Sequence, residues 1–164
     1  MIQLHAQPYN IDATGFYFDT PDAYEAKSTN LKDRYGCPVE EFEIQFIDGD
    51  DIECELAKVM NLNQANMARY FELIDECDEH ELIKIIIGLS EGYDLDKFDP
   101  DGVDIYEVES LADLADRFID EGLYGEVPEH LRNYLDTERM GRDLGYDGYV
   151  EITIAGKRLV YSMR

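Results

Sequence analysis

The clearest periodic pattern in the chain lies between residues 110 and 122. Apolar residues recur there at the spacing i, i+3, i+4, i+7 and i+8, which places them on one side of a helix. They are Leu111, Leu114, Ala115, Phe118 and Ile119. Ser110 is an N-cap candidate before the pattern, and Gly122 follows it where a residue of positive φ commonly ends a helix. The stretch therefore predicts an amphipathic helix whose other face is acidic.

Strict alternation of apolar and polar residues predicts two strands. It occurs at residues 41–46 and again at 103–108, and both runs place acidic side chains on one face. A β-prone run at 13–18 predicts a third strand. Two runs near the C-terminus, 149–154 and 158–161, predict a hairpin because only a short Gly-containing turn separates them.

Helical spacing with capping signals predicts the remaining elements. The expected helical ranges are 22–33, 52–60, 61–92 with a second helix opening at Asp78, 129–134 and 137–143. Mixed short strands and helices indicate an α+β fold with short antiparallel sheets and a helical middle. We expect three subdomains: an α+β subdomain at 1–60, an acidic helical subdomain at 61–102, and an α+β subdomain at 103–164.

The charge is the outlying property of this composition. Of 164 residues, 38 are Asp or Glu and 14 are Lys or Arg, which gives a net charge of −24. Residues 72–121 alone hold 18 acids and three bases. Such a chain does not bind nucleic acid by counterion release and is repelled by anionic membranes. It is suited to a basic partner, for example a DNA-binding groove, although adaptation to high salt also produces acidic surfaces.

Three widely spaced cysteines, Cys37, Cys54 and Cys77, indicate neither a disulfide framework nor a zinc site. A reduced, cytoplasmic compartment follows. The N-terminal residues lack the basic and apolar regions of a signal peptide, and the longest apolar run is too short to span a membrane.

The motifs of a metal or catalytic site are incomplete in this sequence. The stretch 97–108 contains acids at EF-hand spacing, but Lys97 and Val108 occupy positions that need carboxylates. The three histidines, His5, His80 and His130, are far apart, form no zinc-protease motif and are expected to be solvated or to cap helices. Carboxylate pairs are too numerous to single out a glycosidase pair. We expect no enzyme, metal or cofactor site.

Acids three or four residues apart on a helix lie about 5–6 Å apart, which is similar to the spacing of phosphates along a DNA strand. The alternative is that these acids form the ordinary solvated face of an amphipathic helix. The candidate partner-binding carboxylates are Asp99, Asp101, Asp104, Glu107, Glu109, Asp113, Asp116, Asp120, Glu121, Glu126 and Glu129.

Residues 123–144, LYGEVPEHLRNYLDTERMGRDL, resemble the antirestriction segment of the ArdA family. The similarity lies in an apolar pair, a short acidic turn, Pro-Glu, a Leu-Arg-Asn-Tyr helix and a closing Arg-Asp-Leu. The positions that carry it are Leu123, Tyr124, Pro128, Leu131, Arg132, Tyr134, Asp136, Arg142, Asp143 and Leu144. The acidic, tryptophan-free and tyrosine-rich composition is also similar. Tyr124 departs from the Leu or Phe that is usual in the family.

The resemblance implies an elongated homodimer of small α/β subdomains, encoded on a mobile genetic element. Its surface carboxylates would imitate the phosphates of B-form DNA. They would occupy the groove formed by the specificity and methyltransferase subunits of a type I restriction-modification enzyme and inhibit restriction, and in some cases modification. The final strand, 158–161, is expected to offer an edge for the dimer contact.

Two other functions stay open from the sequence. One is a DNA mimic directed at CRISPR effectors or another DNA-binding enzyme. The other, from a different class, is a salt-adapted hydrolase or a divalent-cation-binding protein. Dependence of the fold on molar salt or calcium would distinguish the second from a DNA mimic.

Overall fold

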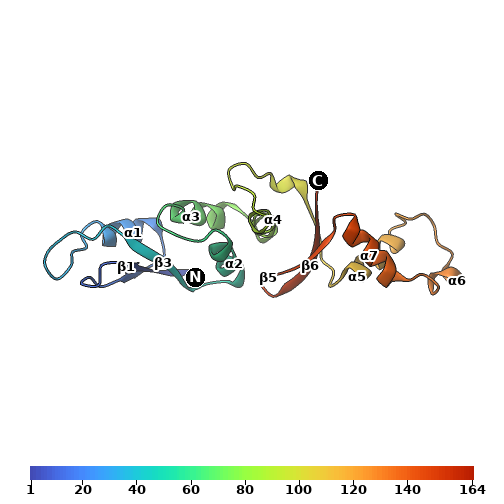
Figure 1. Cartoon of the computed structure of the whole chain (residues 1–164), viewed down its shortest axis with the longest axis horizontal. Coiled ribbons are helices and arrows are strands. Elements are labelled where there is room, and N and C mark those ends of the chain that lie inside the picture. The colour runs from blue at the N-terminus through green and yellow to red at the C-terminus, as the bar shows by residue number, and fades with distance from the viewer. The chain divides into compact units, whose positions relative to one another are not determined.

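The protein is an α+β structure of seven α-helices and two antiparallel sheets of three strands each (Figure 1). The computed structural model describes all residues, 1–164, and confirms the fold class expected from the sequence. The chain divides into two compact units, Met1–Phe98 and Asp99–Arg164. The finer division into three subdomains stays a prediction. None of the helices is long and apolar enough to cross a membrane.

The first unit combines a sheet of order β2-β1-β3 with four helices. Its elements are β1 Gln3–Pro8, β2 Phe16–Phe18, α1 Pro21–Ser28, β3 Phe42–Asp48, α2 Asp51–Val59, α3 Met67–Glu76 and α4 Glu79–Ser90.

The second unit has a sheet of order β4-β6-β5 and three helices. Its elements are a 3₁₀ turn Pro100–Gly102, β4 Val103–Tyr106, α5 Leu111–Asp120, α6 Glu129–Arg132, α7 Thr137–Tyr146, β5 Val150–Ile154 and β6 Lys157–Met163. The predicted C-terminal hairpin is confirmed: β5 and β6 are antiparallel, and Ala155 and Gly156 at its turn both have positive φ, as a type I′ turn requires.

The central strand of the first sheet, β1, was not expected from the sequence. Its buried positions are Leu4, Ala6 and Pro8, which alternate with exposed or half-buried residues. The alternation has the period of a strand, but Ala and Pro are weak strand formers. His5 on this strand is half-buried and its Nδ1 has no hydrogen-bond partner, so the expectation of a solvated or capping residue is wrong there.

Two predicted helical stretches are not helical. The helix expected at 22–33 ends at Ser28. Residues 61–66 form a turn before α3, in which side-chain amides bind the backbone. Asn63 Oδ1 accepts from the Ala65 amide at 2.8 Å, and Asn66 Nδ2 donates to the Met60 carbonyl at 2.8 Å. Asparagine side chains compete with helical hydrogen bonds in this way, which explains why the apolar spacing was misleading.

Two expectations for the second sheet are also wrong. The final strand, expected at 158–161 as an edge, is the central strand β6, paired with β4 on one side and β5 on the other. The alternation at 103–108 does not leave one face wet. Tyr106 lies on the same side of β4 as Asp104, yet its ring packs against Phe118 and Tyr149 at centroid distances of 5.5 and 5.9 Å.

The core of the second unit lies between α5, α7 and the sheet. Leu114, Ala115, Phe118, Leu144 and Val160 form its buried cluster. Helices α5 and α7 approach closely at Gly141, where an added Cβ would lie 2.7 Å from the backbone of Leu111 and Ala112. Glycine is therefore required at this position of α7 by the neighbouring backbone, not by its own φ.

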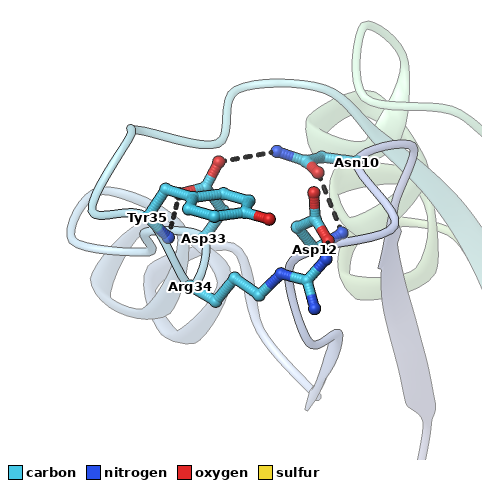
Figure 2. Close-up of polar contacts among 5 residues, drawn as sticks. All are labelled: Asn10, Asp12, Asp33, Arg34 and Tyr35. Atoms are coloured by element: carbon cyan, nitrogen blue, oxygen red, sulfur yellow. Dashed lines mark hydrogen bonds and ion pairs between the residues drawn. The ribbon is translucent and has the colours of Figure 1, made fainter.

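Side chains in the first unit tie two loops together (Figure 2). Asp33 accepts hydrogen bonds from Asn10 Nδ2 at 3.1 Å and from the amides of Tyr35 and Cys37, both at 2.9 Å. Arg34 forms an ion pair with Asp12, and its guanidinium lies 5.0 Å from the centre of the Tyr35 ring. The bond from the Cys37 amide is the largest cause that holds the pKa of Asp33 below its usual range.

The substitution Gly141→Ala should destabilise the second unit by about 1–3 kcal/mol because the new methyl group meets backbone that cannot rotate away. The matched control is Gly145→Ala, on the same helix. Its Cβ would lie 3.4 Å from the end of the Leu111 side chain, and removing a helical glycine can stabilise by up to about 1 kcal/mol. Urea denaturation followed by circular dichroism measures both; equal stabilities would contradict the close approach.

The substitution Asp33→Ala should release the loop at 31–37, because three hydrogen bonds lose their acceptor. Hydrogen exchange at neutral pH should become several-fold faster at the amides of Tyr35 and Cys37. Asp33→Asn keeps an acceptor oxygen and should give an intermediate rate. Asp19→Ala removes an exposed acid of the same unit and should leave both amides unchanged. Unaltered protection in Asp33→Ala would show that other contacts hold the loop.

Candidate partner-binding surface

Helix α5 carries the predicted amphipathic pattern. Leu114, Ala115, Phe118 and Ile119 are buried, and Leu111 is half-buried. The N-cap is Ser110, whose Oγ accepts from the Asp113 amide at 3.1 Å and donates to the Asp113 carboxylate at 2.7 Å. The amide of Leu111 is satisfied from the sheet, by Glu151 Oε1 on β5 at 2.8 Å. The helix is thus fixed by its apolar face and by two caps.

The candidate carboxylates are almost all solvent-exposed. Ten of the eleven are exposed, Asp104 is half-buried, and no charged residue of the chain is buried. Glu107, Glu109, Glu126 and Glu129 form no hydrogen bond or ion pair, so they present free carboxylates. A basic partner can reach these four charges without breaking a contact within the protein.

Several other candidate carboxylates already have a partner within the protein. Glu121 pairs with Arg117 one helical turn earlier, at 2.8 Å, and this bond is the largest cause that raises the pKa of Arg117. Asp104 pairs with Arg164 at 2.9 Å. Asp99 accepts from the Asp101 amide at 3.0 Å and so caps the 3₁₀ turn. These contacts use part of the hydrogen-bonding capacity of the acids, although water still reaches each of them.

Arg132 on α6 brings two acids of α5 together. Its guanidinium pairs with Asp120 and lies 3.4 Å from Asp116 Oδ1. The hydrogen bond to Asp120 is the largest cause that raises the pKa of Arg132. Arg132, Asp120, Glu121 and Glu126 also line one depression of about 370 Å³ between the end of α5 and α6. The acidic face of α5 is therefore partly neutralised by a residue that follows it in the chain.

Residues 123–144 have unlike structural roles. Leu144 is buried in the core, and Asp136 caps α7 by accepting from the Arg139 amide at 3.0 Å. Arg142 and Asp143 are exposed on α7. Before α7, Leu123 is 61% exposed and Tyr134 is 85% exposed, and Tyr124, Pro128, Leu131 and Leu135 are exposed as well. Burial, together with the nearby Tyr149, Asp147 and Asp143, raises the pKa of Tyr124.

Sequence reasoning missed the structural roles of three residues near this surface. The Arg117–Glu121 pair follows the i, i+4 rule and could have been found from its spacing. Arg132 lies 12 and 16 residues from its two partners, and Glu151 lies 40 residues from the amide it caps. No local pattern connects residues so far apart, so only the tertiary structure reveals these contacts.

The acidic stretch at 97–108 does not assemble an EF-hand. Residues 100–102 form the 3₁₀ turn, and β4 begins directly after it at Val103. The Asp99 carboxylate is engaged as the cap of that turn. No group of three or more His, Cys, Asp or Glu side chains in the chain is arranged to hold a metal ion.

The fold and this surface define a small acidic α+β protein whose most distinctive feature is exposed charge. A sequence model of the family described as antirestriction protein (ArdA) matches residues 12–158. The chain therefore belongs to the ArdA family of antirestriction proteins, as the resemblance of residues 123–144 predicted. A comparison with curated proteins gives no match. Family membership supports an antirestriction role and implies interaction with restriction enzymes.

Proposed function

We propose that this protein inhibits type I restriction-modification enzymes by presenting its carboxylates in place of the phosphates of B-form DNA. The family match over residues 12–158 carries the antirestriction role. Mimicry of DNA is supported by the exposure of the candidate carboxylates and by the net charge of −24. The inhibitor acts by stoichiometric binding in the cytoplasm, without a cofactor and without catalysis.

The partner surface is the DNA-binding groove formed by the specificity and methyltransferase subunits. That groove must be rich in Lys and Arg because it neutralises DNA phosphates. Each of the eleven candidate carboxylates stands for a phosphate position. Glu107, Glu109, Glu126 and Glu129 contribute most because their charges are unpaired. Occupation of the groove blocks restriction, and it blocks modification as well where the same subunits bind DNA for both reactions.

The active form we propose is a homodimer. Two chains would carry 48 excess negative charges, equivalent to about 80 Å of duplex at one charge per roughly 1.7 Å. This length corresponds to about two dozen base pairs, which is the scale of a site on a large restriction complex. Because β6 is paired on both sides, a dimer contact made by strand pairing in the second sheet would have to use β4 or β5.

A competition assay tests the function. A purified type I enzyme is bound to a labelled duplex that contains its recognition site, and the protein is added at low and at high salt. The proposal requires stoichiometric displacement of DNA that weakens as salt rises, because screening reduces the attraction between the acids and the groove. If the protein displaces DNA from a CRISPR effector but not from a type I enzyme, the CRISPR effector is its target. If the protein displaces DNA from no DNA-binding enzyme and its fold needs molar salt or calcium, a salt-adapted hydrolase or a divalent-cation-binding protein is favoured instead.

Joint replacement of four unpaired carboxylates, Glu107, Glu109, Glu126 and Glu129, by glutamine should weaken inhibition by a factor between about four and several hundred. This range follows from about 0.2–1 kcal/mol for each exposed charge pair. The control replaces four acids outside the candidate set by their amides: Asp19, Asp22, Glu25 and Asp75. It changes the net charge equally. If both variants lose inhibition equally, total charge matters and the candidate positions do not.

A single substitution, Asp113→Asn, should leave most inhibition intact, with a loss of about fivefold at most. The charge is shared among many acids, and one exposed pair contributes little. Titration of restriction activity with wild-type and variant protein measures this effect. Complete loss of inhibition in Asp113→Asn, with an unchanged circular dichroism spectrum, would contradict a distributed charge.

A further inference from the structure

The segment from Gly125 to Leu135 is joined to the rest of its unit by few contacts. Helix α6 within it has only four residues and none of them is buried. The backbone hydrogen bonds of the segment are local, such as Leu131 N to the Pro128 carbonyl at 2.9 Å and Tyr134 N to the Leu131 carbonyl at 3.0 Å. Such a segment has little apolar burial or long-range bonding to fix its position.

Arg132 supplies the polar connection that the backbone lacks. It is the one residue of the segment that forms an ion pair, and both partners, Asp116 and Asp120, lie on α5. Helix α5 is fixed by a buried face and by two caps. The ion pairs of Arg132 therefore fix the position of the short helix α6 relative to α5. A guanidinium suits the task because its several N–H donors can reach two carboxylates at once.

Arg132 carries a charge opposite to that of the acids around it. If the protein acted on a basic groove through charge alone, an arginine beside two of the candidate carboxylates would oppose binding. Arg132 cancels charge at two candidate carboxylates, and Glu126 and Glu129 lie in the segment that it holds. Arg132 therefore has two opposing effects on binding. It lowers the negative charge that attracts a basic groove, and it orders the segment that carries Glu126 and Glu129.

We propose that Arg132 is a positioning residue, which holds the segment 125–135 and its free carboxylates Glu126 and Glu129 in place against α5. The depression of about 370 Å³ supports this arrangement, because Arg132 lines it together with Asp120, Glu121 and Glu126. Without Arg132, like charges at Asp120 and Glu126 would repel and the segment would move outward. The inhibition arm of the test rests on the proposed function, and the structural arm does not.

The decisive comparison is between Arg132→Gln and Arg117→Gln in the full-length protein. Both variants raise the net negative charge by one, and both remove an arginine that pairs with an acid of the candidate set. Arg117, however, pairs with Glu121 at i, i+4 and joins no second element. Arg132→Gln should weaken inhibition of a type I enzyme roughly fivefold, the size of one exposed charge network. Arg117→Gln should inhibit as well as the wild type or better. Equal or improved inhibition by Arg132→Gln would overturn the proposal.

Hydrogen exchange of the unbound proteins gives a readout independent of any enzyme. Amides of residues 125–135 should exchange faster in Arg132→Gln and keep wild-type rates in Arg117→Gln, and Arg132→Lys should be intermediate. If the wild type inhibits no enzyme, the proposed function fails, but exchange still decides the role of Arg132. If inhibition falls while exchange is unchanged, Arg132 contacts the enzyme directly and the positioning role is wrong.

Discussion

The mutual repulsion of the carboxylates is the constraint on which the rest of this structure depends. A net charge of −24 on 164 residues opposes any compact state, and burying an unpaired carboxylate is more costly still. The fold meets both demands by keeping every charged residue at least partly accessible to water. Apolar side chains then fill two separate small cores, each covered by a short sheet and amphipathic helices. The exposure of charge is therefore a condition of folding as well as the means of binding that we propose.

Several of the acids also accept hydrogen bonds from the backbone and so stabilise the fold. Asp78, Asp99 and Asp136 accept backbone amides at the starts of the elements that they precede, and Glu151 on β5 accepts the first amide of α5. These positions place negative charge next to unsatisfied N–H groups, where it is stabilising. A carboxylate used in this way keeps its charge and stays accessible. The same residues can therefore order the chain and contribute to the negative field that a basic groove meets.

Periodicity predicted the elements with strong apolar faces and failed where side chains override it. The buried stripe of α5 and its Ser110 cap were correct because i, i+3 and i+4 spacing reports a helix face directly. Residues 61–66 were wrong because asparagine side chains bind the backbone there, and β1 was missed because Ala6 and Pro8 are weak strand formers. The exposure of most candidate acids also follows from the sequence pattern, and their role in binding stays a prediction. Arg132 could not be assigned its role, because its partners lie 12 and 16 residues away and only the tertiary structure brings them together.

A charge mimic must solve a problem that net charge alone does not describe. Phosphates lie at fixed positions on a duplex, whereas unpaired carboxylates on a loosely held segment move apart because they repel one another. Each added acid therefore increases attraction to a basic groove and decreases the order of the surface that presents it. An arginine placed between acids reduces the attraction to the groove but restores the order of the surface. On this argument the most effective arrangement contains a few cations that join separate elements. Arg132, which joins α6 to Asp120 of α5, and Arg164, which joins the end of β6 to Asp104 of β4, have this arrangement.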